Sequence, residues 1–154
     1  EESKASSELV YEYLEANCAP QFIVYSPEEV TTFNGLCDQG LIPKGKHNVL
    51  FVLGRYTDNQ QSDPKDLVSF VEANEQDHRG SICAFGSQER ACAALAMSLG
   101  GHVRLGFENS LWRADGTVAR DNAQVIEEGV ALAELLGRKI ATVEEAGQLL
   151  KSSK

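Results

Sequence analysis

The chain has 154 residues, of which 42% are apolar and 24% charged, and its formal net charge at pH 7 is -9. This length suits one domain with a sizeable core, and the acidic balance argues against nucleic acid or an anionic membrane surface as a partner. No apolar run is long enough to cross a bilayer, and no targeting segment or C-x-x-C pair is evident, so we expect a reduced, cytoplasmic protein.

Hydrophobic spacing and turn residues predict helices and strands in strict alternation. A first helix, capped by Ser3 or Ser6, is expected to run to about Asn17. Short apolar runs predict four strands, at residues 21–25, 48–54, 81–86 and 102–106. Further helices are expected to begin at Ser26, Asp63, Ser87, Asp121 and Thr142. Apolar positions expected to face the core include Ala91, Met97, Val125, Ile126, Leu135 and Leu136.

This order of elements predicts an α/β fold with a parallel sheet and helices packed on its faces. Four strands are too few to close a barrel, which needs about eight. Two architectures remain open for residues 1–154, taken as a single α/β unit. One is an open, doubly wound sheet, and the other is the carboxyl-terminal half, about four β/α units, of a (β/α)8 TIM barrel.

The most informative stretch is residues 100–112, GGHVRLGFENSLW. Alternation along the predicted strand places Arg104 on the same face as His102 and Gly106, and Glu108 follows just past the strand end. An inward arginine followed by a carboxylate is typical of a site at the carboxyl ends of parallel strands. A surface Arg–Glu pair beside a turn explains the same pattern.

Residues 100–111 resemble a signature of the β-keto acid cleavage enzymes, the family typified by 3-keto-5-aminohexanoate cleavage enzyme. Weaker similarity is found at residues 51–54, 84–86, 121–123, 136–138, 140–142 and 144–146. The resemblance implies a zinc-dependent (β/α)8 barrel that condenses a β-keto acid with acetyl-CoA and releases acetoacetate and a new CoA ester. This chain would be the carboxyl-terminal half of such a barrel, and the complete protein a homo-oligomer or a pair of halves.

The resemblance also assigns roles to site residues. Glu108 aligns with the family's zinc-binding glutamate, and Arg104 aligns with the arginine that pairs with the substrate carboxylate. A guanidinium fork suits a planar carboxylate, and zinc suits the polarisation of a keto oxygen. Asn109 stands where many relatives have an aspartate used in acid–base chemistry. An amide cannot take a proton at neutral pH, so Asn109 is expected to orient a substrate or water by hydrogen bonds.

The family's other zinc ligands, two histidines in an H-x-H motif, are absent from the chain. His47, His78 and His102 are isolated, and one carboxylate does not make a zinc site. We therefore expect the missing ligands in an amino-terminal half, and no catalysis from these 154 residues alone.

Other readings of the sequence remain open. An inert half barrel would act as an assembly module, because it exposes sheet edges and apolar surface. An open sheet that binds a phosphorylated small molecule is a weaker alternative, since no phosphate-binding motif is present. Residues 55–59 directly follow a predicted strand, so they could reach a substrate, although a solvated loop has the same composition.

Overall fold

A computed structural model describes residues 2–151, and side chains from residue 4 onward. Its regular elements, apart from a short 3-10 turn at Asp58–Gln60, are α1 (Glu2–Glu15), β1 (Gln21–Val24), α2 (Pro27–Asp38), β2 (Asn48–Leu53), α3 (Asp66–Ala73), β3 (Arg79–Ala84), α4 (Glu89–Ser98), β4 (His102–Val103), α5 (Asn122–Leu135) and α6 (Val143–Leu150). The predicted alternation of strands and helices is confirmed.

The four strands form one parallel sheet in the order β1-β2-β3-β4. Strand β4 is shorter than predicted: it pairs with β3 through His102 and Val103 only. One more ladder bond runs from the backbone N–H of Arg104 to the carbonyl of Ile82, at 2.8 Å. The backbone then turns away at Gly106, whose φ is +157°. The sequence run 102–106 therefore supplies a short strand and the loop that leaves it.

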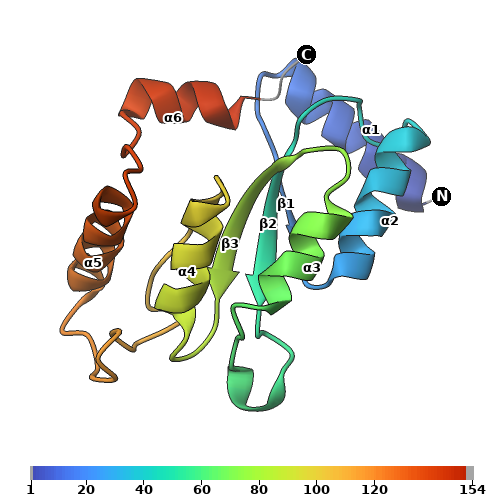
Figure 1. Ribbon diagram of the computed structural model, residues 1–154. Helices are drawn as coiled ribbons and strands as arrows, with labels where there is room; N and C mark the ends of the chain where they lie inside the picture. Colours follow the sequence, from blue (N-terminus) through green and yellow to red (C-terminus); the bar gives the residue numbers. More distant parts are fainter. Residues whose placement is uncertain (1, 152–154) are drawn as a thin grey trace.

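Helices α2, α3 and α4 pack on one face of the sheet, the near side in Figure 1. The main core lies between these helices and the strands and includes Phe51, Leu53, Leu67, Phe70 and Ile82. The doubly wound alternative is wrong for the described residues, because the helices that pack closely on strands share this one face. The observed sheet is consistent with a part of a barrel.

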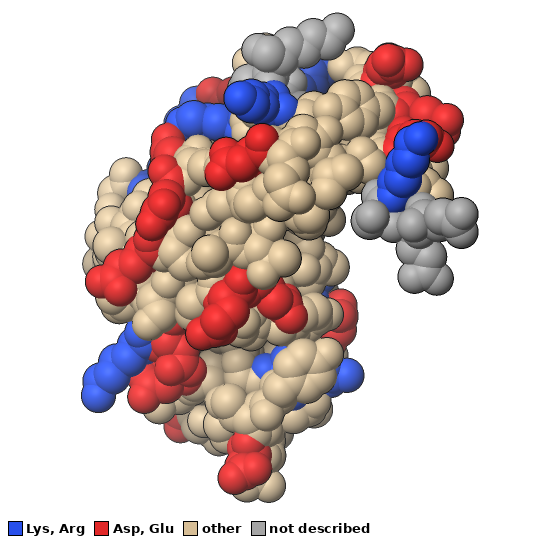
Figure 2. Space-filling view, turned by 90° about the vertical axis from the view of Figure 1, so that its right-hand side faces the viewer, with Lys and Arg blue, Asp and Glu red and all other residues tan. Residues whose placement is uncertain are grey.

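The opposite face of the sheet carries a second, smaller apolar cluster of Leu50, Val52, Cys83 and Phe85. All six residues of β2 are buried, as the continuous apolar run predicted. Figure 2, turned by 90°, shows an outline that is hollowed on the side away from α2 and α3. We call this the concave face. At its edge Ile23 of β1 is 47% exposed.

Helix starts follow the sequence where a side chain can reach the first turn. Ser26, Asp121 and Thr142 each accept a hydrogen bond from the backbone N–H three residues on, as predicted. The prediction for Ser6 is wrong, because α1 already begins at Glu2, and the side chain of Ser3 lies outside the described residues.

Ser87 does not cap α4 either. Its hydroxyl donates to the side-chain oxygen of Gln61 at 3.2 Å, and the helix begins after Gln88 without a side-chain cap. The core-facing residues of α4 are Cys92, Ala93, Ala96 and Met97, whereas Ala91 is exposed, contrary to prediction. The buried stripe is therefore shifted along the helix from the one predicted at Ala91.

The last two helices bury less than their sequences predict. Leu135 is 84% exposed, and Ile126 and Leu136 are also exposed, although all three are predicted to face inward. No residue of α6 is buried. The chain after α6 is nevertheless tied to the sheet, since the Asn48 amide donates to the Leu150 carbonyl at 2.8 Å. No described helix is long and apolar enough to span a membrane.

Candidate functional site

The loops that follow β2, β3 and β4 meet at the carboxyl edge of the sheet. Hydrogen bonds join them directly: the Ser62 hydroxyl donates to the Phe85 carbonyl at 2.8 Å, and the Ser110 hydroxyl donates to the Gly86 carbonyl at 2.9 Å. The backbone N–H of Gly86 donates to the Asn109 carbonyl at 3.3 Å. Because parallel strands place their carboxyl ends together, this edge is the expected position of a ligand site.

Arg104 lies on the concave face at this edge. Its Nη2 is 3.5 Å from the Sγ of Cys83 and 3.4 Å from Oε1 of Glu108. Both charged side chains are open to solvent, at 42% exposed for Arg104 and 75% for Glu108, so this contact is a weak ion pair. Burial raises the pKa of the Cys83 thiol, which leaves it a neutral support beneath the guanidinium. The structure thus brings Arg104 and Glu108 together, with donors to spare on the arginine.

Asn109 differs from its neighbour Glu108 because its side chain is buried. It is 7% exposed, and its Nδ2 has no hydrogen-bond partner among the residues that the structure describes. The residue helps to line a cavity of about 210 Å³, together with Phe85, Phe107 and Trp112. A buried amide group without a hydrogen-bond partner destabilises the fold unless a ligand or a water molecule supplies the missing hydrogen bond. The Nδ2 atom is itself shielded from solvent, so it is an unpaired donor behind the wall of this cavity.

The described residues do not form a zinc site by themselves. His47 and His78 belong to the opposite, amino edge of the sheet, and His102 begins β4 at that same edge. In residues 2–151 no three histidine, cysteine, aspartate or glutamate side chains group closely enough to hold a metal ion. Glu108 is available as one ligand, but the other ligands of a zinc ion would have to come from elsewhere.

A buried ion-pair network supports the loop after β4, and sequence analysis did not predict it. Glu89 is 1% exposed, and its Oε2 lies 2.6 Å from Nη1 of Arg90. Its Oε1 accepts the backbone N–H of Gly106 at 3.5 Å. Glu128 of α5 contacts two arginines: its Oε2 is 3.5 Å from Nε of Arg90, and its Oε1 is 2.6 Å from Nε of Arg113 in the loop after β4. The sequence feature that could have indicated this network is the pair Glu89 and Arg90 in the first turn of α4, which is otherwise mostly apolar.

The pKa of Glu89 follows from this position. Burial raises the pKa of its carboxyl group, and the Arg90 guanidinium and the Gly106 N–H oppose that rise. The network ties α4 and α5 to the segment that carries Glu108 and Asn109. Glu89 is therefore a supporting residue, not one that reaches the open part of the site.

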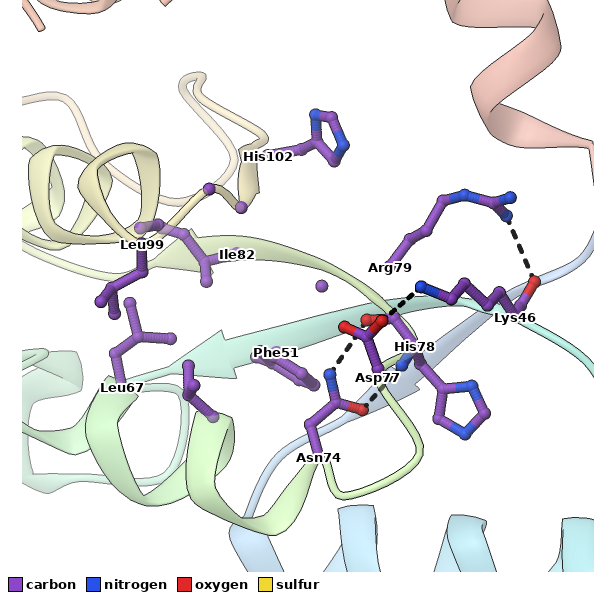
Figure 3. A pocket seen from close by; sticks show the side chains of 15 residues that line it. Lys46, Phe51, Leu67, Asn74, Asp77, His78, Arg79, Ile82, Leu99 and His102 are labelled. Atoms are coloured by element: carbon purple, nitrogen blue, oxygen red, sulfur yellow. Dashed lines mark hydrogen bonds and ion pairs between the residues drawn. The ribbon is translucent and has the colours of Figure 1, made fainter.

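The amino edge of the sheet holds a second polar cluster, shown in Figure 3. Lys46 pairs with Asp77, and the Asn74 side chain exchanges hydrogen bonds with the backbone of His78. The rings of His47 and His78 are buried with their centroids 5.6 Å apart. Burial, and then the nearby His47, lower the pKa of His78 to about 4. The two histidine rings of this cluster are packed into the core, whereas the Lys46–Asp77 pair is exposed.

These features define an α/β protein with an open polar site at the carboxyl ends of parallel strands. Comparison with known proteins gives the family: the beta-keto acid cleavage enzyme family profile matches residues 2–151. The chain belongs to that family.

The chain is similar to several characterised enzymes. It is 38% identical over 116 residues to the 3-keto-5-aminohexanoate cleavage enzyme of Fusobacterium nucleatum, covering 75% of this chain and 41% of that enzyme. It is 36% identical over 91 residues to the enzyme of the same name from Acetoanaerobium sticklandii, covering 59% and 33%. It is also 36% identical over 94 residues to the 3-dehydrocarnitine:acetyl-CoA trimethylamine transferase of Rhizobium meliloti, covering 59% and 31%. The chain thus spans less than half the length of these relatives.

Proposed function

We propose that the complete protein containing this chain is a β-keto acid cleavage enzyme. It transfers the acyl group of a β-keto acid to coenzyme A, and the acetyl group of acetyl-CoA becomes part of acetoacetate. The observation that carries the proposal is the contact of the exposed Arg104 and Glu108 side chains at the carboxyl edge of the sheet, on the loop that also carries Asn109. Family membership over residues 2–151 supports it.

Each residue has a role that suits its surroundings. Arg104 binds the substrate carboxylate, because its guanidinium is half exposed and its one carboxylate contact among the described residues is the weak pair with Glu108. Asn109 orients a substrate or a water by hydrogen bonds at the cavity that it helps to line. It holds no titratable proton, so it orients the substrate and leaves acid–base work to another group.

Zinc use is part of the same proposal. Glu108 supplies one carboxylate ligand from the exposed end of the loop after β4. The remaining ligands come from a part of the protein outside these residues, since residues 2–151 contain no set of three. The chain then forms one half of a (β/α)8 barrel, and its concave face lines the barrel interior.

The proposal is tested by turnover and zinc content of the complete protein. Wild-type protein is incubated with acetyl-CoA and a panel of β-keto acids, and acetoacetate is measured. We expect Glu108→Gln to lower both bound zinc and turnover, the latter at least ~100-fold. The matched control is Glu127→Gln, which changes an exposed carboxylate on α5. Normal zinc content and turnover in Glu108→Gln would refute the role of Glu108, and no acetoacetate from any keto acid would refute the proposed function.

A second candidate function is assembly without catalysis, supported by exposed apolar side chains on α5 and α6. Leu135 and Val143 are 84% and 85% exposed, and Leu136, Ile140 and Leu150 are exposed near them. Apolar surface of this kind favours association. Native mass spectrometry of the complete protein separates the two functions: a metal-free oligomer without turnover favours assembly, and a zinc-bound one with turnover favours catalysis.

A further inference from the structure

A second guanidinium, that of Arg55, also lies at the carboxyl edge of the sheet. Arg55 directly follows Gly54 at the end of β2, and its Cζ is 5.3 Å from the centroid of the Phe85 ring. Phe85 belongs to the apolar cluster of the concave face, as does Cys83, whose Sγ contacts Arg104. The two arginines therefore flank the end of β3 on one face of the sheet.

The sheet order sets the distance between these arginines. They follow β2 and β4, which are separated by β3 alone. Adjacent strands lie ~4.8 Å apart, so β2 and β4 are roughly 10 Å apart across the sheet. Arg104 lies level with Cys83 and Val52 in the register, so the backbone of Arg55 is also three residues further along the strands. The side chains reduce this offset, because Arg104 contacts Cys83 and Arg55 lies against Phe85, two residues on along the chain. A short chain with a carboxylate at each end spans this gap and reaches one guanidinium at either side.

In the described part of the chain, Arg55 also has fewer carboxylate partners than Arg104. Arg104 has Glu108 as a partner, whereas Arg55 makes no ion pair with any carboxylate among the described residues. Asp66 lines the same cavity of about 300 Å³ as Arg55 but does not pair with it. The Phe85 ring stabilises the charge of Arg55 without using its five N–H donors. These donors remain available to an anion.

The loop that carries Arg55 is folded tightly against the sheet. Gly54 has φ +78°, and a Cβ there would lie 2.6 Å from the backbone nitrogen of Ser62. The Thr57 hydroxyl donates to the Gln61 carbonyl at 2.6 Å and accepts the Gln61 backbone N–H at 3.0 Å. Because the loop closes on itself this way, the backbone of Arg55 is held at the strand end. A fixed backbone lets one side chain discriminate between ligands.

We propose that Arg55 binds a second anionic group of the substrate, so that the site selects β-keto acids with a carboxylate at each end. Arg104 holds the carboxylate next to the keto group, and Arg55 holds the distal one. This assignment rests on the proposed function, since it names the substrate class of the same site. It makes Arg55 a specificity-determining residue.

The test is equilibrium binding to the complete protein, measured by calorimetry with unreactive probes. Adipate carries two carboxylates, and hexanoate carries one on a chain of equal length. We expect Arg55→Gln to weaken adipate binding at least ~10-fold and to change hexanoate binding far less. Arg104→Gln should weaken both ligands. Lys44→Gln, which makes the same charge change in the exposed loop before β2, serves as the control and should affect neither ligand.

Three results would overturn the inference. Adipate could bind no more tightly than hexanoate to the wild type, or Arg55→Gln could weaken both ligands equally, which would make the residue structural. Arg55→Gln could also weaken coenzyme A and spare adipate, which would assign Arg55 to a CoA phosphate. Because binding does not require turnover, Arg55-dependent adipate binding without acetoacetate formation would uphold this inference while refuting the proposed reaction.

Discussion

The buried histidines at the amino edge of the sheet and the Arg104–Glu108 pair at its carboxyl edge differ in their exposure to solvent. At the amino edge His47 is 1% and His78 3% exposed, and aromatic rings pack around them. At the carboxyl edge Arg104 and Glu108 are 42% and 75% exposed and meet only weakly. Buried polar groups affect the free energy of unfolding, whereas exposed and loosely paired groups are free to bind ligands.

This difference shows that residue type alone does not locate a functional site. Histidines are the commonest metal ligands, yet the two nearest each other here belong to the core. The candidate site instead consists of an arginine, a glutamate and an amide on a loop. In parallel-sheet barrels, ligand sites lie at the carboxyl edge, where the exposed Arg104–Glu108 pair is found here.

The largest effect on stability is expected from Glu89, the buried exception at the carboxyl edge. Glu89→Ala leaves Arg90 buried without its closest partner, and breaking such a pair costs about 3–5 kcal/mol of unfolding free energy. Urea denaturation of the complete protein measures this change. Glu127→Ala removes an exposed carboxylate one helix away and should change the midpoint very little. Equal midpoints for the two variants would show that the network does not support the fold.

Acid is expected to destabilise the protein through the amino edge. The pKa of His78 is about 4 in the folded protein and near 6.5 in an unfolded chain, so the unfolded state binds more protons between these values. Stability is therefore lost as the pH falls from about 6.5 to about 4, by about 3 kcal/mol in total. Denaturation midpoints measured across this range test the prediction.

The matched variant for this prediction is His78→Gln. Glutamine keeps a side-chain acceptor for the His47 backbone N–H, which donates to His78 Nδ1 at 3.3 Å, but it does not titrate. The loss of stability between pH 6.5 and 4 should shrink in this variant. Asp77, whose pKa the Lys46 ammonium lowers, loses its contribution only at lower pH. An unchanged pH profile in His78→Gln would contradict the assignment.

The smallest of these free-energy changes is expected at Arg104, and it concerns binding. Arg104→Gln removes a charged partner of the substrate carboxylate, which costs about 2 kcal/mol, or a roughly 30-fold rise in KM. Arg104→Lys should recover only part of the loss, because an ammonium lacks the planar fork. Stability should hardly change, because the pair with Glu108 is exposed. A fall in stability without a rise in KM would show that Arg104 has a structural role and does not bind the substrate.

Local patterns in the sequence predicted most of the backbone. The continuous apolar run of β2 signalled a fully buried strand, and Thr142 with Glu145 signalled the capping box of α6. The resemblance at residues 100–111 identified the family, which the match over residues 2–151 confirms. The predicted helix cap at Ser87 was wrong, because the Ser87 hydroxyl donates to the side-chain oxygen of Gln61 instead of capping α4. A serine near a helix start has several acceptors within reach, and only tertiary packing selects one.

The sequence by itself determined the order of elements, the parallel sheet and the family, because each depends on periodicity or on a contiguous motif. Only the tertiary structure decided which polar groups are buried and which are open. Arg55 and Arg104 are 49 positions apart in the chain, and Glu89 and Gly106 are 17 apart. Their relations arise from strand order and loop closure, which no local spacing encodes. The burial of His47 and His78 and the exposure of Arg104 and Glu108 are therefore properties of the folded sheet.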